Sequence, residues 1–329
     1  MKQRQLGKNG PPVSAIGLGC MAFSGGYGVP DDLESIATVR AALDAGISYI
    51  DSGDFYGMGH NEMLLQQALK GARDKAFLSI KFGALRTPDL KWSGYDLRPE
   101  AIRNFLAYSL KRLGTDYIDL YQPARLDSEV PVEEVVGTIA DLVKQGYVRH
   151  VGLSEASAKS VARAQAVTPI AALQIEYSMF SRGIEDAILP AIRERGIGLV
   201  AYGVLSRGLI SPHVTGATGH SGIRGRMPRF QGESFTANAK LVSDLQTIAT
   251  DLGLTLPQLA FAFVLSRGDD IVPLAGARNR AQLADILKAA DVTLSPEILR
   301  RIEATVPKGA VLGTRYGAEQ MKSLDSEMR

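Results

Sequence analysis

Short runs of apolar and β-branched residues alternate along the chain with longer segments in which apolar side chains recur every three or four positions. The runs with strand character are Ala15–Leu18, Tyr49–Asp51, Phe77–Lys81, Tyr117–Tyr121, Val148–Leu153, Ala172–Glu176, Gly198–Tyr202 and Ile271–Leu274. The segments with helical periodicity are Leu33–Ala45, Asn61–Leu69, Pro99–Leu113, Val132–Lys144, Ala158–Ala166, Ile188–Glu194 and Ala281–Ala289. This alternation indicates a parallel sheet with helical crossovers, and eight strands are the number that closes a (β/α)8 barrel. We therefore predict an α/β fold, a TIM barrel that forms a single domain over residues 1–329.

Three segments fall outside this repeat. Arg4–Val13 contains Lys-Asn-Gly between short runs, which predicts an N-terminal β-hairpin that closes the bottom of the barrel. Ser206–Ala237 is long and rich in Gly and Ser, as expected for a lid or a disordered segment, and two extra helices are predicted after it at Lys240–Asp251 and Leu256–Ser266. The tail that follows Val306 is interpreted as solvent-exposed.

Composition excludes some classes of function. The 45% hydrophobic and 22% charged residues are typical of a soluble globular protein, and a net charge of +2 produces no strong field for nucleic acid or an anionic membrane. Cys20 is the single cysteine, so we expect a buried thiol and a reducing compartment. The chain has no long apolar stretch, and its four histidines lack metal-ligand spacing. We expect a cytoplasmic protein without metal, nucleic-acid or membrane partners, and the sequence does not indicate its oligomeric state.

The candidate chemistry lies at the ends of the predicted strands. Asp51 and Lys81 close the second and third strands, and Tyr56 lies in the loop after the second. Side chains at the carboxyl ends of barrel strands converge on one mouth. There an ammonium would lower the pKa of the phenol, and a carboxylate would hold the ammonium in place. The three residues are therefore predicted to form a proton-delivery unit.

Five segments of the chain resemble the aldo-keto reductase family over nearly its whole length. They are Gly17–Met21, Tyr49–Gly57, Leu113–Gln122, Val148–Ser154 and Gln174–Ser178. The resemblance implies a barrel that binds extended NADPH at its C-terminal mouth and reduces carbonyl compounds. It also implies that Tyr56 is the proton donor, Lys81 its activator and Asp51 the partner of that lysine.

The same resemblance assigns the nicotinamide end of the cofactor. Ser154 and Gln174 resemble the residues that bind the carboxamide, and Tyr202 resembles the aromatic residue that stacks on the ring. Glu155 stands where the family often has Asn. A carboxylate can accept a hydrogen bond from the amide N–H but cannot donate one to the amide oxygen.

The phosphate and adenine ends are assigned in the same way. Gly203–Gly208, including Gly203, Leu205 and Arg207, resembles the segment around the pyrophosphate. Gly276, Ala277 and Arg278 resemble the site of the 2′-phosphate, for which Arg278 supplies the charge. Gln282 and Asp285 resemble adenine-side residues, whereas Ala284 and Ile286 replace the frequent Glu and Asn. The resemblance therefore implies NADPH as the cofactor, with NAD(H) less favoured.

One departure from the family concerns the substrate. Ala124 occupies the position of the usual active-site histidine, which donates a hydrogen bond to the substrate's carbonyl oxygen. Loss of this contact is expected to cost roughly 1–3 kcal/mol unless another donor replaces it. The space that it leaves suggests a bulkier or self-hydrogen-bonding substrate, such as an aromatic aldehyde with an adjacent hydroxyl like pyridoxal. Tyr27 and Trp92 are further candidates for the pocket.

The sequence also allows a different nucleotide-binding motif and two other functions. Gly17–Ala22 fits the dinucleotide-binding pattern G-x-G-x-x-A, but such a turn opens directly into a helix, whereas Phe23–Pro30 continues as a loop. Within enzymes, the alternative is a dehydrogenase that oxidises an alcohol such as pyridoxine or a sugar. From another class, the alternative is an NADPH-binding redox-sensing subunit with weak turnover.

Overall fold

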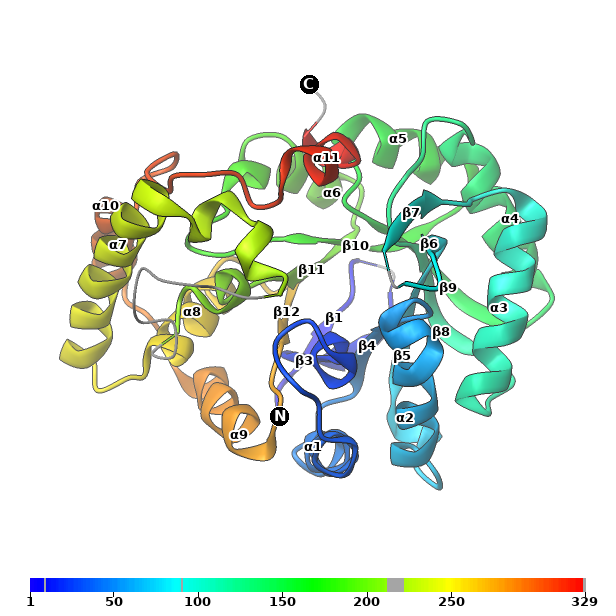
Figure 1. Ribbon diagram of the computed structural model, residues 1–329, viewed down its shortest axis with the longest axis horizontal. Coiled ribbons are helices and arrows are strands. Elements are labelled where there is room, and N and C mark those ends of the chain that lie inside the picture. The colour runs from blue at the N-terminus through cyan, green and yellow to red at the C-terminus, as the bar shows by residue number, and fades with distance from the viewer. Residues whose placement is uncertain (9, 90, 212–221, 328–329) are drawn as a thin grey trace.

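Eight parallel strands form a closed barrel, in the order β3-β4-β5-β8-β9-β10-β11-β12 (Figure 1). The structure is a computed structural model that describes residues 1–8, 10–89, 91–211 and 222–327. The strands are β3 Gly17–Gly19, β4 Tyr49–Gly53, β5 Phe77–Phe82, β8 Ile118–Pro123, β9 Val148–Ser154, β10 Ile170–Glu176, β11 Gly198–Tyr202 and β12 Ile271–Ala275. All eight overlap the predicted strands, and the predicted TIM barrel is confirmed.

The helices of the outer ring also follow the prediction. They are α1 Asp32–Asp44, α2 His60–Ala68, α3 Pro99–Leu113, α4 Val132–Lys144, α5 Ala158–Val167, α6 Ile188–Glu194, α8 Leu256–Leu265 and α9 Arg280–Leu287. Their ends have local causes. Gly114 ends α3 in the left-handed conformation at φ 62°, which glycine adopts without steric cost. Thr255 begins α8 with a reciprocal cap, in which its hydroxyl accepts from the Gln258 backbone N–H.

The barrel interior is divided into an apolar lower layer and a polar upper layer. Side chains two residues apart on a strand share a face, so Tyr49 and Asp51 of β4 both point inward at different heights. Tyr49 packs with Leu120 and with Leu6 and Val13 of the N-terminal hairpin. This hairpin, β1 Gln3–Gln5 and β2 Pro12–Ser14, closes the bottom as predicted. The polar residues are thereby confined to the upper end.

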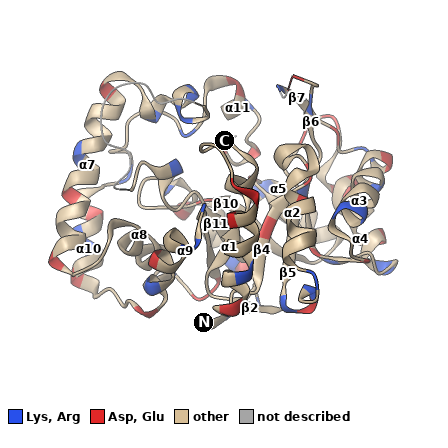
Figure 2. Cartoon of the chain, turned by 60° about the horizontal axis from the view of Figure 1, so that its bottom comes forward, with Lys and Arg blue, Asp and Glu red and all other residues tan. Residues whose placement is uncertain are grey.

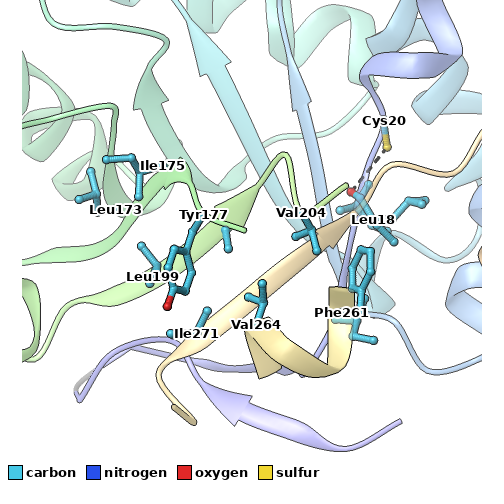
Figure 3. Close-up of a cluster of buried hydrophobic side chains, with 14 of the residues drawn as sticks. Leu18, Cys20, Leu173, Ile175, Tyr177, Leu199, Val204, Phe261, Val264 and Ile271 are labelled. Carbon is cyan, nitrogen blue, oxygen red and sulfur yellow. Dashed lines mark hydrogen bonds between the residues drawn. The ribbon is translucent and has the colours of Figure 1, made fainter. Parts of the chain in front are cut away.

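A second apolar core lies between the barrel and its helices, and Figure 3 shows part of it. Leu18 of β3, Ile271 of β12 and Phe261 of α8 are completely buried there. Cys20 is also fully buried, as predicted, and burial raises the pKa of its thiol. Packing of strand and helix side chains in this layer holds the strand ends at the upper rim.

Several elements, among them α10, Pro296–Thr305, were not predicted from the sequence or differ from the prediction. After β5, β6 Ala84–Arg86 and β7 Trp92–Tyr95 form an antiparallel hairpin. Helix α7, Gly232–Asp251, is longer than predicted and packs against α10. Helix α8 packs against β12 and α9, so that it belongs to the outer ring and is not an extra helix. Residues 212–221 of the predicted lid, with His213 and His220, lie outside the described residues.

The C-terminal tail folds back onto the barrel, so the interpretation of a solvent-exposed tail is wrong. In Figure 1 the red segment runs from α10 toward α5 and contains α11, Ala318–Lys322. The backbone N–H of Ser326 donates to the Glu155 carbonyl at 2.9 Å, and that of Ser157 donates to the Asp325 carboxylate at 2.6 Å. The tail therefore contacts the upper rim.

Charges of both signs are interspersed over the helices in Figure 2. Among the described residues, no single helix is long and apolar enough to cross a bilayer, and only α7 and α8 taken together, bent by 86°, pass on length and composition.

Candidate active site

A buried ion pair lies at the upper end of the barrel interior. Asp51 and Lys81 come from neighbouring strands, and the Lys81 Nζ is 2.6 Å from Asp51 Oδ2 and 2.8 Å from Oδ1. Each residue is only 4% exposed. Burial lowers the pKa of Lys81, and Asp51 opposes this effect. Gln174 donates from Nε2 to Asp51 Oδ1 at 2.7 Å, so a third strand fixes the carboxylate.

Tyr56 lies beside this pair. It begins a short turn after β4, in which Gly57 and Met58 have φ of 59° and 56°. The Lys81 Nζ is 5.3 Å from the centroid of the Tyr56 ring. The structure thus brings together the three residues of the predicted proton-delivery unit.

The predicted lowering of the Tyr56 pKa is not found. Burial, followed by the charge of Asp51, raises the pKa of Tyr56 well above its ordinary value, and the guanidinium groups of Arg207 and Arg125 act in the opposite direction. A half-buried phenol next to a neutralised ion pair loses more by desolvation than it gains from the cations. Tyr56 is consequently protonated at neutral pH, which is the form that a proton donor requires.

Two buried polar atoms beside the ion pair have no hydrogen-bond partner among the described residues. They are the Ser154 hydroxyl and the Gln122 side-chain carbonyl oxygen. Buried polar groups are rarely left unpaired. A carboxamide, which both donates and accepts, is a group that could pair with such atoms. The predicted cofactor position of Ser154 therefore fits the structure.

Glu155 has a different set of partners from the one predicted. Its carboxylate accepts hydrogen bonds from Arg315, from Tyr202 Oη at 2.6 Å, from Ser326 Oγ at 2.6 Å and from the Glu176 backbone N–H at 3.1 Å. Burial alone would raise the pKa of Glu155, but Arg315 holds it well below its usual range. Because these donors satisfy both oxygens, we reassign Glu155 from the carboxamide to the tail.

The tail places a second tyrosine over the mouth. The Tyr316 hydroxyl accepts hydrogen bonds from Arg207 Nη2 and, at 3.4 Å, from Arg125 Nη2. It also lies 2.8 Å from the Tyr202 hydroxyl. The Arg207 guanidinium is 5.0 Å from the ring centroids of both tyrosines. In this structure, the predicted stacking partner of the nicotinamide, Tyr202, is covered by Arg207.

Arg207 belongs to a turn with a strained backbone. Gly203 has φ of 68°, while Ser206 and Arg207 have φ of 46° and 60°, which side chains with a Cβ rarely adopt. Strain of this kind clusters at ligand-binding segments. The backbone N–H of Gly208 donates to the Leu205 carbonyl at 2.8 Å and closes the turn. This shape is compatible with the predicted role at the pyrophosphate.

Tyr27 lies among arginine side chains. Its hydroxyl accepts from Arg207 Nη1 at 3.2 Å, and its backbone carbonyl accepts from Arg278 Nη1 at 2.9 Å. The Arg224 guanidinium is 5.4 Å from its ring centroid. This arrangement places Tyr27 on the side predicted for the cofactor phosphates, and it adds Arg224 to the candidate phosphate ligands.

The residues predicted for the 2′-phosphate and adenine end of the cofactor fall into two groups in the structure. Arg278 is exposed, and its backbone N–H donates to Gln282 Oε1 at 2.9 Å at the start of α9. Gly276 has open space where a Cβ would point, and Ala277 is buried. The carboxylate of Asp285, in contrast, accepts from Thr255 Oγ1 and Gln258 Nε2 at the start of α8. We therefore assign Asp285 to helix packing.

The candidate substrate pocket has aromatic residues on one side. The Trp92 ring packs edge to face on Phe55, with centroids 6.1 Å apart, and Phe55 packs in the same way on Tyr56 at 4.8 Å. Trp92 also packs on Tyr95 at 5.1 Å. Ala124 is 2% exposed, and its backbone N–H is bonded to the Phe82 carbonyl, so it offers no free donor. Trp92 is thus connected to Tyr56 through Phe55, whereas Ala124 is buried; the assignment of both to a substrate pocket stays a prediction.

The chain is similar to known proteins over almost its whole length. The profile of the aldo/keto reductase family matches residues 15–307. A probable aldo-keto reductase 1 of Glycine max is 40% identical over 318 residues, which cover 95% of this chain and 91% of that protein. The aldo-keto reductase yakc of Schizosaccharomyces pombe, whose name specifies NADP(+), is 36% identical over 320 residues, 95% of this chain and 94% of that protein.

Solved structures agree with these relatives. A glycerol dehydrogenase of Gluconobacter oxydans superposes with a TM-score of 0.85 at 29% identity, and the match covers 93% of this chain and 95% of that one. The chain belongs to the aldo/keto reductase family, and it is therefore an oxidoreductase of the class that carries out NADP-dependent carbonyl reduction.

Several residues at the mouth were not found from the sequence. Arg125, Arg315, Tyr316 and Tyr95 reach it from the segment after β8, from the tail and from an unpredicted hairpin. One signal was available for Arg315. A carboxylate at the end of a buried strand, as at Glu155, requires a cationic partner. The sequence gives no distance that would identify which cation it is.

Proposed function

We propose that this protein is an NADPH-dependent reductase that converts aldehydes or ketones to alcohols. The observation that carries the proposal is the buried ion pair of Asp51 and Lys81 next to the ring of Tyr56, at the carboxyl ends of barrel strands. When bound, NADPH supplies the hydride that reduces the carbonyl carbon. Tyr56 gives its phenolic proton to the carbonyl oxygen, which becomes the hydroxyl of the product.

Other side chains stabilise the charge that develops on Tyr56 and bind the cofactor. Lys81 faces the developing phenolate with its positive charge, and Asp51 and Gln174 keep that ammonium in place. Ser154 binds the carboxamide, while Arg207, Arg224 and Arg278 bind the phosphates. The exposed guanidinium of Arg278 and the NADP(+) name of the fission yeast relative support NADPH over NADH.

Oxidation of an alcohol is the second candidate, because a structural neighbour is named as a glycerol dehydrogenase. In that direction Tyr56 would have to accept a proton as the phenolate. The same groups serve both directions, and we place reduction first because the two curated relatives are named as aldo-keto reductases.

The test is to mix the purified protein with NADPH and a panel of aldehydes and to follow NADPH consumption. We expect consumption with at least one aldehyde, and much slower formation of NADPH from NADP(+) and the corresponding alcohol at neutral pH. NADPH binding with negligible consumption across the panel would contradict the proposal and favour a redox-sensing subunit. Faster turnover in the oxidative direction would favour the dehydrogenase.

A further inference from the structure

Arg125 follows Ala124 directly, and its side chain turns back toward the mouth. Nη1 donates to the Ala124 carbonyl at 2.6 Å, and Nη2 donates to the Tyr316 hydroxyl at 3.4 Å. The guanidinium carbon is 5.8 Å from the centroid of the Tyr316 ring. A guanidinium has five N–H donors, so three of them are not used by these contacts.

Within the described part of the chain Arg125 forms no salt bridge, because the nearby acids pair with other cations. Asp51 pairs with Lys81, and Glu155 pairs with Arg315. Glu176 lies 3.5 Å from Arg207 and 3.6 Å from both Arg229 and Arg315. Arg125 is half-buried, its hydrogen-bond partners are neutral, and the charge of Glu155 acts on it only from beyond salt-bridge distance, whereas a desolvated charge is normally paired directly.

Two cations converge on one neutral oxygen. Arg125 and Arg207 both donate to the hydroxyl of Tyr316, a phenol that offers them no negative charge. Charge-assisted hydrogen bonds to an anionic oxygen are roughly twice as strong as neutral ones. The position is therefore better matched to a carboxylate or phosphate oxygen than to the phenol that lies there.

This position adjoins both the predicted proton donor and an apolar surface. Arg125 is close enough to Tyr56 and Lys81 to act on the pKa of each. Phe55, Trp92 and Tyr95 form an aromatic cluster next to Tyr56, and its member Tyr95 is also close enough to Arg125 for the two side chains to interact electrostatically. A molecule that presents a carbonyl to Tyr56 would thus meet rings along its body and a guanidinium at one end.

We propose that Arg125 binds an anionic group of the carbonyl substrate, and that the substrates are aldehydes with a carboxylate or phosphate on an aromatic or apolar body. This inference rests on the proposed reductase function. It extends the expectation drawn from Ala124, because the residue that follows Ala124 in the chain is a cation that would select the substrate.

The test compares para-carboxybenzaldehyde with its uncharged methyl ester at saturating NADPH. We expect the wild-type kcat/KM to favour the carboxylate by at least about tenfold. Arg125→Met should lower this preference by about 10- to 100-fold, mainly through KM, and Arg125→Lys should retain part of it. Arg300→Met, at an exposed arginine of α10, is the matched control and should leave the preference unchanged.

Three kinetic results would overturn the inference. The wild-type protein could have the same kcat/KM for both aldehydes. Arg125→Met could lower kcat/KM equally for both, which would place its action on the carbonyl oxygen or on the fold. Arg125→Met could instead weaken NADPH binding and leave the preference intact, which would identify the cofactor pyrophosphate as the anion.

A binding measurement separates this inference from the proposed function. Trp92 is the sole tryptophan and lies next to Phe55, so its fluorescence reports on the pocket without turnover. We expect para-(hydroxymethyl)benzoate, but not its methyl ester, to change the fluorescence of the wild type and to lose this effect in Arg125→Met. If neither aldehyde is turned over but the carboxylate still binds through Arg125, only the reductase proposal fails. Equal responses to carboxylate and ester would overturn the anion site.

Discussion

Two groups of charged residues meet at the barrel mouth, and they are built differently. The Asp51–Lys81 pair comes from adjacent strands in fixed register, at positions that the strand pattern defines. The Glu155–Arg315 pair joins a strand end to a tail residue 160 positions later. The first pair leaves its charges next to the predicted proton donor, whereas the second fixes the tail and Tyr316 over the mouth. Similar buried ion pairs can thus serve chemistry in one place and assembly in the other.

We expect substitutions in the two ion pairs to have different effects. Damage to the pair next to Tyr56 should reduce catalysis even when stability is restored. Damage to the pair that holds the tail should act first on stability and on substrate affinity.

Replacement of the lysine is expected to have the largest effect. Lys81→Met leaves the Asp51 carboxylate buried and unpaired, which should cost about 3–5 kcal/mol in the free energy of unfolding. It should also lower kcat by about 10²- to 10⁴-fold, because the proton donor loses its cationic neighbour. Urea denaturation and steady-state kinetics measure the two effects. The double variant Asp51→Asn/Lys81→Met should recover most of the stability but not the activity, and recovered activity would contradict the assignment.

Removal of the tail cation should act mainly on stability. Arg315→Met leaves Glu155 buried without its main cation, with an expected loss of about 3 kcal/mol in the free energy of unfolding. Because Tyr316 is then less well positioned, we expect KM for the aldehyde to rise more than kcat falls. The matched control is Glu155→Gln/Arg315→Met, in which no buried charge is left unpaired. A kcat loss as large as that of Lys81→Met would show that the two pairs do not differ in role.

The pH dependence of stability tests the same pair. The folded-state pKa of Glu155 lies below its unfolded value of about 4.3, so its contribution is present above that pH and is lost as the pH falls through the folded value. The advantage of the wild type over Glu155→Gln in unfolding free energy should therefore be constant near pH 6 and should begin to shrink as the pH is lowered from about 4 toward about 3. Denaturant titrations at several pH values measure this difference. An advantage independent of pH would exclude an ionised Glu155.

A smaller effect of the opposite sign is expected at Asp54. Burial and the nearby Glu62 raise the pKa of Asp54 to about 8. Because the folded state then binds a proton that the unfolded state releases, the cost to stability grows as the pH rises from about 4 to about 8. Asp54→Asn should thus be more stable than the wild type by about 1–3 kcal/mol near pH 8 and nearly equal to it near pH 4. A stability difference that does not vary with pH would contradict this.

The fold could be predicted largely because local patterns determine it. Period-2 and period-3.6 runs identified the strands and outer helices, and strand ends identified Asp51, Lys81 and Gln174. Elements without such signals were missed. The hairpin that carries Trp92 is short and contains Gly94, and α11 spans only five residues. Partners far apart in the chain, such as Arg315 for Glu155, depend on packing that no sequence period encodes.

The direction of the Tyr56 pKa shift was wrong for a related reason. The sequence indicated a lysine close to the phenol, and a neighbouring cation lowers a pKa. It also indicated that Asp51 partners this lysine, but it did not indicate how far burial and the charge of Asp51 raise the pKa of the phenol. Burial and the charge of Asp51 raise the pKa of Tyr56 more than the neighbouring cations lower it.

The most direct test of the central claim is the rate of NADPH oxidation by Tyr56→Phe with the best aldehyde, at saturating NADPH. This change removes only the hydroxyl and keeps the ring that packs on Phe55. We predict that kcat falls by about 10²- to 10⁴-fold while the affinity for NADPH is unchanged. A kcat within about threefold of the wild type would contradict the assignment of Tyr56 as the proton donor.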